Sequence, residues 1–345
     1  MRALIKERSE ENLKLKEIEF NPSLGPHDVL VRVRRASICG SDVHIYKWEE
    51  WVRSRMKLPR IIGHEYTGEV VETGDLVTRV KKGDLVASET HIPCGRCYQC
   101  LTGRMHICKN MEILGFDIDG AFADYVVVPE VVLWKLSEGI EPEYASVMEP
   151  LGNAVHTALV TNLSGKTVLI TGAGPIGLMA IEVARVSGAS FIIVSEVKDY
   201  RIKLAKEIGA DVVVNPLEED LVKRVMKETN GEGVDVFLEM SGKQSALIEG
   251  LRSLTNGGVA SLLGIFEGDV TLNPDDLIIF KGITVYGITG RKMFETWRIV
   301  DQLLKSKKLD LSKIVTHVLD FEEWEKGFEL MVKGECGKVV LKIND

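Results

Sequence analysis

The sequence predicts an α/β protein with two domains, one a doubly wound parallel six-stranded domain and the other mostly β. Three observations support this prediction. A glycine-rich turn joins an apolar segment, Thr167–Thr171, to a helical pattern that ends at Ser187. Apolar and helical segments then alternate, which is typical of a parallel sheet. The residues before about Glu149 instead form short apolar runs between Gly, Pro and Asp turns. With 345 residues, the chain is long enough for both domains.

The bulk composition limits the functional classes. With 45% hydrophobic and 27% charged residues, it is that of an ordinary globular protein. A formal net charge of −8 argues against nucleic acid or an anionic membrane as a partner. No apolar run has the length of a membrane span, and the N-terminus is charged where a signal peptide needs an apolar core. We therefore expect a cytoplasmic protein, in which the six cysteines indicate metal ligands or buried thiols rather than disulfides.

The first segment has the pattern of a small β barrel or sandwich with irregular loops. Its expected strands are Leu13–Phe20, Val29–Arg34, Gly68–Thr73, Leu85–Glu89 and Ala123–Val128. Two groups of potential metal ligands lie in or next to this segment.

The first group is a loop with four cysteines, Cys94, Cys97, Cys100 and Cys108. Four thiolates at this spacing match tetrahedral zinc, and a site with no position left for water is structural. His106 lies in the same loop. Because four cysteines leave it no vacancy, we expect His106 to be exposed.

The second group is dispersed and comprises Cys39, the pair His64–Glu65, and Glu149. Each is common by itself, but together they offer one sulfur, one imidazole nitrogen and carboxylate oxygen. Such a mixed, incompletely filled ligand set is typical of catalytic zinc, which keeps one position for water or substrate. Zinc in such a site lowers the pKa of a bound alcohol.

The glycine-rich turn has the spacing Gly172-x-Gly174-x-x-Gly177, and Glu196 follows the next apolar strand. Gly172 permits the tight turn, Gly174 lets the backbone approach a pyrophosphate, and Gly177 lets the helix pack closely on the sheet. The free N–H groups at the helix start can then bind the phosphates. An acid at the position of Glu196 accepts ribose hydroxyls and repels a 2′-phosphate, which favours NAD over NADP.

Lys198 and Arg201 follow closely, and these cations weaken the argument for NAD over NADP. Both residues either lie in an exposed first helical turn, or Arg201 contacts the adenosine of the cofactor. Helices are expected at Lys198–Ile208, Leu217–Thr229 and Met293–Ser306.

Six apolar segments match the strand number of a complete doubly wound sheet. They are Thr167–Thr171, Phe191–Ser195, Asp211–Val214, Val234–Leu238, Val259–Leu263 and Ile283–Tyr286. The last segment, Ile314–Ile343, is predicted to be a helix plus a strand.

The chain resembles the zinc-containing medium-chain alcohol dehydrogenase family along essentially its whole length. Three motifs carry the resemblance: Gly63-His64-Glu65-x-x-Gly68, the four-cysteine loop and the Gly172 fingerprint. It implies a GroES-like catalytic domain, residues 1–150 and 294–345, and a Rossmann domain, residues 151–293. Within the family, the threonine dehydrogenases are most similar, on the segments His44–Trp51, Glu89–Gly95 and Gly287–Trp297.

The resemblance also implies the roles of individual residues. Cys39, His64 and Glu65 would bind a catalytic zinc, with Glu149 either a fourth ligand or a carboxylate behind the ligands. Ser41 and His44 would form a proton relay, with Ser in place of the usual Thr. The NAD contacts would come from Gly172, Gly174, Ile176, Gly177, Glu196, Arg201, Leu263, Gly264, Ile265, Ile288 and Thr289. Each chain would hold two zinc ions, and the assembly would be a homotetramer.

The reaction that the resemblance implies is oxidation of L-threonine to 2-amino-3-oxobutanoate with NAD+. Arg291, Lys47 and Arg53 are candidates for binding the substrate carboxylate, and spacing singles out none of them. One alternative is a polyol or vicinal-diol dehydrogenase, acting on sorbitol or 2,3-butanediol with the same ligand set. Another is a non-catalytic protein that binds zinc only at the four cysteines.

Several other residues have two interpretations. His91 borders the substrate pocket, by resemblance, or is a hydrogen-bonded loop histidine. For His156 we expect a satisfied position between the domains. Trp48 and Trp51 either wall the pocket or cover the barrel, and Cys336 is expected to be inert.

Overall fold

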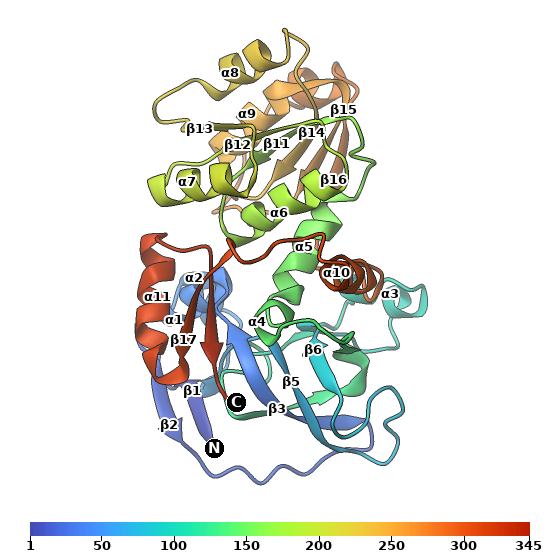
Figure 1. Cartoon of the computed structure of the whole chain (residues 1–345), viewed down its shortest axis with the longest axis vertical. Coiled ribbons are helices and arrows are strands. Elements are labelled where there is room, and N and C mark those ends of the chain that lie inside the picture. Colours follow the sequence, from blue (N-terminus) through green and yellow to red (C-terminus); the bar gives the residue numbers. More distant parts are fainter.

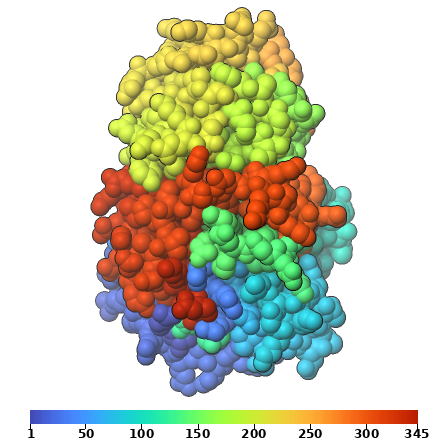
Figure 2. Space-filling model, viewed as in Figure 1, coloured from blue at the N-terminus to red at the C-terminus, as the bar shows by residue number.

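The computed structural model describes residues 1–345 and has two halves stacked along its long axis (Figure 1). The upper half contains a six-stranded sheet, and the lower half contains the other sheets together with both chain termini. The C-terminal residues, red in Figure 2, cover the waist between the halves on the face shown.

The six-stranded sheet is parallel throughout, which confirms the predicted fold class. Its order is β13-β12-β11-β14-β15-β16, so successive strands are added to one side of β11 up to β13 and to its other side from β14 onward. Ligands of such sheets bind beyond the carboxyl ends of the strands at this switch point. The strands are β11 (Thr167–Thr171), β12 (Phe191–Ser195), β13 (Val212–Val214), β14 (Val234–Glu239), β15 (Leu254–Leu262) and β16 (Thr284–Gly287).

Helices cover both faces of this sheet (Figure 1). One apolar cluster contains α6 (Pro175–Val186) and α7 (Asp199–Ile208), and another contains α8 (Leu221–Glu228) and α9 (Gln244–Ser253). α8 starts later than predicted because Asp220 caps it, accepting a hydrogen bond from Lys223 N at 2.9 Å. A one-turn π-helix at Asp275–Ile279 was not predicted.

The lower half is built on a seven-stranded sheet with the order β10-β6-β5-β3-β18-β17, in which β9 also pairs with β3. Strands from the two ends of the chain meet here, because β18 lies antiparallel to β3. The strands are β3 (Asp28–Ser37), β5 (Glu65–Thr73), β6 (Leu85–Ser88), β9 (Tyr125–Pro129), β10 (Leu133–Lys135), β17 (Val315–Asp320) and β18 (Lys338–Lys342).

Smaller elements complete this half. The strands β1 (Arg2–Lys6), β2 (Lys14–Glu17) and β4 (Arg60–Ile61) form one small sheet, and β7 (His91–Ile92) and β8 (Glu112–Ile113) form another. The helices are α1 (Gly40–Lys47), α2 (Glu50–Arg53), α3 (Tyr98–Leu101), α4 (Pro142–Ala145), α5 (Met148–Ala158), α10 (Glu295–Lys305) and α11 (Trp324–Lys333). Short 3₁₀ turns occupy Met105–Ile107, Glu130–Val132 and Phe321–Glu323.

A single apolar core connects the two halves. α5 contributes Val155 to the same buried cluster as Ala87 of β6, Leu178 of α6 and Trp297 of α10. The halves are therefore fixed to one another around α5, which runs from one to the other in Figure 1. None of the helices combines the length and apolar character needed to cross a membrane.

Candidate active site

Three members of the dispersed ligand group meet at the junction of α1 and β5. Cys39 is the residue before α1, and Glu65 is the first residue of β5, directly after His64. One ligand atom from each of the three lies within 4.8 Å of those of the other two. Residues far apart in the sequence can therefore bind one ion.

The Glu65 carboxylate fits a metal ligand. Its Oε2 lies 2.5 Å from Lys338 Nζ and accepts a hydrogen bond from Ser37 Oγ, and both charged side chains are buried. Its Oε1 is buried without any hydrogen-bond partner. A buried orphan oxygen costs free energy unless a cation or donor satisfies it, so this atom is available to a metal.

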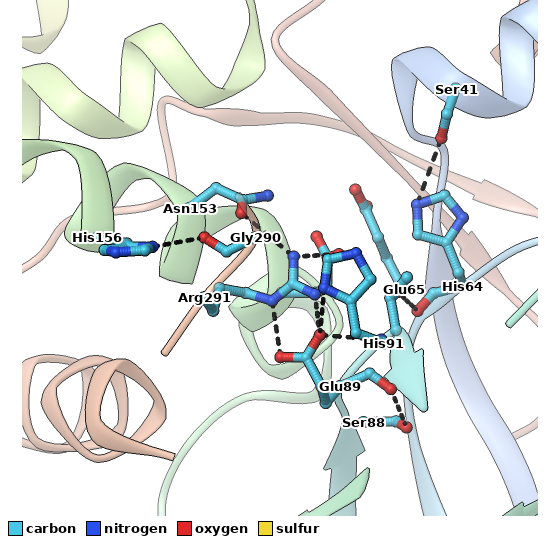
Figure 3. A network of polar contacts seen from close by, with 12 residues as sticks. Ser41, His64, Glu65, Ser88, Glu89, His91, Asn153, His156, Gly290 and Arg291 are labelled. Carbon is cyan, nitrogen blue, oxygen red and sulfur yellow. Dashed lines mark hydrogen bonds and ion pairs between the residues drawn. The ribbon is translucent and has the colours of Figure 1, made fainter. Parts of the chain in front are cut away.

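His64 is oriented from behind by Asp42. Its Nδ1 lies 3.5 Å from Asp42 Oδ1, while the other oxygen of Asp42 accepts a hydrogen bond from Cys39 N. Burial by itself lowers the pKa of His64, but the charges of Asp42 and Cys39 outweigh it and raise that pKa. A carboxylate behind a ligating histidine is a common arrangement in metal sites. Ser41 Oγ lies 3.5 Å from His64 Nε2, so the predicted relay hydroxyl faces the ligand group (Figure 3).

Glu149 does not join that group and faces Arg291 instead. Arg291 Nη1 lies 2.5 Å from Glu149 Oε1, and its Nε donates to Glu89 Oε2 at 2.9 Å. Its Nη2 donates to Glu89 Oε1, and Nη1 also donates to Asn153 Oδ1 (Figure 3). Since Arg291 is 1% exposed and its nitrogens are committed to these acceptors, it is not a free cation for a substrate carboxylate.

The other two candidates for binding the substrate carboxylate lie on the surface. Lys47 and Arg53 are both exposed, and Arg53 Nε donates to Trp48 O at 2.6 Å. Trp48 is buried, whereas Trp51 is 44% exposed and stacks on Phe116.

Three histidines gather where the chain returns from the upper half. His156 Nδ1 donates to Gly290 O at 2.8 Å, as expected for a satisfied position between the halves. The His91 ring also lies against Gly290, and its buried Nδ1 has no hydrogen-bond partner, with Glu89 Oε1 3.6 Å away, so it is not a hydrogen-bonded loop histidine. His106 is half-buried against His156, which corrects the expectation of exposure; the four-cysteine loop folds back onto α5.

The four cysteines also converge. Their four sulfur atoms all lie within 4.8 Å of one another, and Cys97 Sγ is 3.5 Å from Cys100 Sγ and 3.7 Å from Cys108 Sγ. Tetrahedral zinc with bonds of about 2.3 Å requires sulfurs about 3.8 Å apart. The backbone N–H of Arg96 and the Asn110 side chain lower the pKa of Cys94 to about 6, which favours the ligating thiolate.

The glycine turn has the geometry of a dinucleotide site. Gly172 has φ +85°, which a side chain rarely adopts, and a Cβ at Gly177 would lie 2.0 Å from Gly172 O. Gly174 is the residue before α6, and only Arg201 Nη1, at 4.0 Å, lies within 4 Å of a Cβ placed there. The backbone beside Gly174 is thus open to a ligand next to a guanidinium group.

Glu196 follows β12 beside this turn and holds three backbone N–H groups. Its Oε2 accepts from Ala173 N at 2.8 Å, and Oε1 accepts from Val197 N and Lys198 N. The remaining predicted contacts lie at the same edge. Ile176 is in α6, Leu263, Gly264 and Ile265 follow β15, and Ile288 and Thr289 follow β16.

Four residues that pair with His64, Glu65 or Arg291 were not predicted: Asp42, Glu89, Asn153 and Lys338. Only Asp42 had a local signal, because it lies one helical turn from Cys39. Cys336 is buried, and burial raises the pKa of its thiol to about 11, which is consistent with an inert residue.

The fold and these sites define a two-domain dehydrogenase that uses zinc and a nicotinamide cofactor. The family model described as "Alcohol dehydrogenase GroES-like domain" matches residues 25–138, and the one described as "Zinc-binding dehydrogenase" matches residues 175–306. The chain belongs to the zinc-containing medium-chain alcohol dehydrogenase family.

The whole chain is also similar to individual dehydrogenases of this family. The chain is 53% identical to L-threonine 3-dehydrogenase of Pyrococcus horikoshii over 344 residues, 99% of each chain, and 48% identical to that of Bacillus subtilis over 341 residues, covering 99% and 98%. Among solved structures, alcohol dehydrogenase TADH from Thermus sp. ATN1 superposes with a TM-score of 0.91 at 33% identity, covering 100% of both chains. The 2R,3R-butanediol dehydrogenase from Bacillus subtilis gives 0.88 at 29% identity, covering 99% of both chains.

Proposed function

We propose that the protein is an L-threonine 3-dehydrogenase, which oxidises the secondary hydroxyl of L-threonine to give 2-amino-3-oxobutanoate, with NAD+ as the hydride acceptor. The observation that carries the proposal is the convergence of Cys39, His64 and Glu65 on one point. The full-length relatives named L-threonine 3-dehydrogenase support this choice of substrate.

We assign two zinc sites to each chain. Cys94, Cys97, Cys100 and Cys108 would hold the structural ion, and Cys39, His64 and Glu65 would hold the catalytic one. A catalytic zinc supplies Lewis-acid polarisation of an alcohol. Glu149 would lie behind this group, because its carboxylate is paired with Arg291. Residues 1–150 and 294–345 would form the zinc-binding domain, and residues 151–293 the cofactor domain.

The chain's own residues would hold the ligands and move the proton. Asp42 orients His64, and Lys338 balances the charge of Glu65. Ser41 would accept the hydroxyl proton of the substrate, and His44, which is exposed on α1, would release it to solvent. The turn at Gly174 would receive the NAD pyrophosphate on the N–H groups of α6.

A substrate comparison tests the proposal. We expect NAD+ reduction to be fastest with L-threonine and much slower with sorbitol and 2,3-butanediol. Polyol or diol dehydrogenase activity is the second candidate, because a structural neighbour is named 2R,3R-butanediol dehydrogenase. Turnover of L-threonine far below that of the diols would favour this second candidate.

We further infer a homotetramer. The edge strand β16 leaves Val285 39% and Tyr286 41% exposed, which is unusual for apolar side chains on a free sheet edge. Sedimentation velocity would test this, with a particle of four chains expected and a monomer contradicting it.

A further inference from the structure

The outer end of the proposed relay is a histidine paired with a carboxylate. His44 Nδ1 lies 2.7 Å from Glu49 Oε2, and the two side chains are 46% and 40% exposed. The imidazole also packs against Trp51 in a T-shaped arrangement, with ring centroids 5.8 Å apart. Because Trp51 is itself stacked on Phe116, the imidazole is held between a carboxylate and a fixed aromatic ring.

The Glu49 carboxylate makes no hydrogen bond other than the one to His44. Glu49 is the residue before α2, where a carboxylate commonly caps the helix, but its side chain makes no capping hydrogen bond. Its backbone N donates to His44 O at 3.2 Å, past the left-handed residue Trp48 that ends α1. The turn therefore brings Glu49 back over His44, and the side chain is directed to the imidazole rather than to α2.

This pairing determines which nitrogen of His44 can accept a proton. A carboxylate only accepts hydrogen bonds, so a neutral His44 must carry its proton on Nδ1. Nε2 is then the free base. Lys47 lies one turn further along α1. In the upper half the charge of His44 reaches Glu267, whose pKa is lowered first by its hydrogen bond from Lys243 and also by His44.

We propose that Glu49 is a positioning residue of the relay, which keeps His44 in the Nδ1–H tautomer so that Nε2 can take the proton released by the substrate. The proposal rests on the relay proposed above. The proton arrives at Nε2 and leaves from Nε2 to water, while the Nδ1 proton remains in the hydrogen bond to Glu49. The carboxylate also stabilises the imidazolium that exists between these two steps.

The test compares Glu49→Leu, which removes the acceptor, with Glu49→Gln, whose amide oxygen can still accept from Nδ1–H. Nitrogen-15 NMR of the full-length protein reports the tautomer of His44, assigned with His44→Asn. We expect the Nδ1–H form in the native protein and in Glu49→Gln, and the Nε2–H form in Glu49→Leu. The kcat for L-threonine should fall about tenfold in Glu49→Leu, with a nearly unchanged KM. This is less than the roughly 10²–10⁴-fold effect of removing a general base, because His44 itself is retained. The matched control is Glu50→Leu, the exposed neighbour, which should change neither property.

Two results would overturn the proposal: an unchanged tautomer in Glu49→Leu, or a changed tautomer with an unchanged kcat. In the second case, His44→Asn separates the causes. If His44→Asn also keeps its kcat, the relay itself is wrong. If it loses activity, the relay stands and only the role of Glu49 fails.

Discussion

Arg291 and Glu149 form a buried ion pair, with Nη1 and Oε1 2.5 Å apart, where the chain returns from the upper half to the lower half. The same guanidinium is paired with Glu89, so two buried carboxylates share one cation. Burial by itself raises the pKa of Glu89, but the charge and hydrogen bonds of Arg291 outweigh it and hold that pKa at about 2. Arg291 is therefore the counter-charge of both carboxylates that are buried at this junction.

Replacing Arg291 by Met should destabilise the protein by about 3–5 kcal/mol, because it leaves buried carboxylates without a counter-charge. Urea denaturation at pH 7 measures this change. The control is Lys292→Met, since Lys292 pairs only with exposed Glu295 at 3.7 Å and should matter by less than about 1 kcal/mol. A loss of less than about 1 kcal/mol for Arg291→Met would show that the pair contributes little.

Metal content should depend on two independent sets of ligands, one with four cysteines and one that contains Cys39. We expect native mass spectrometry to find two zinc ions per chain in the intact protein. Cys39→Ser should lose one ion and the activity, and Cys97→Ser should lose the other ion together with stability, because a structural zinc contributes folding free energy. Cys336→Ser is the control and should keep both ions. A single zinc in the intact protein would support the non-catalytic alternative.

The sequence could predict the four-cysteine loop and the glycine turn because each has a local signature. The four cysteines share one loop, and the glycine turn is contained in one strand–helix connection. The dispersed group of Cys39, His64 and Glu65 was predicted only from its combination of ligand types and from the family resemblance. The Arg291 contacts could not be predicted, because Glu89, Glu149 and Arg291 meet only through the packing of α5 against the returning chain. Lys338 was missed for a similar reason. A lysine at the start of a strand usually reaches solvent, and only the pairing of β18 with β3 brings it to Glu65.

The burial of His91 should make stability depend on pH. Burial, and then the charge of Arg291, lower the pKa of His91 to about 4 from an ordinary value near 6.5. Between these values the unfolded chain binds a proton that the folded protein does not. Stability should therefore be highest above pH 6.5 and fall as the pH drops toward 4, by at most about 3 kcal/mol from this residue.

Urea denaturation at pH 7, 6 and 5 measures this dependence. His91→Asn cannot titrate and should lose less stability over that range than the native protein. His27→Asn removes a histidine whose side chain is 62% exposed and should keep the native dependence. Equal pH dependence in the native protein and His91→Asn would show that His91 does not titrate as proposed.

The choice between NAD and NADP should depend on Glu196. Its carboxylate lies beside the glycine turn, where a 2′-phosphate would meet a buried negative charge. We expect kcat/KM to be higher for NAD+ than for NADP+, and Glu196→Ser to reduce that ratio at least about tenfold, which corresponds to about 1.4 kcal/mol. Because Glu196 also holds three backbone N–H groups, the variant should bind both cofactors more weakly, so the ratio is the informative quantity.

The control for Glu196 is Asp199→Asn, which removes an equal charge from the exposed start of α7. Long-range electrostatics at this surface are screened by salt, so Asp199→Asn should change the ratio less than about twofold. An effect as large as that of Glu196→Ser would mean that the overall charge of the loop sets the preference. An unchanged ratio in Glu196→Ser would show that Glu196 does not set the cofactor preference.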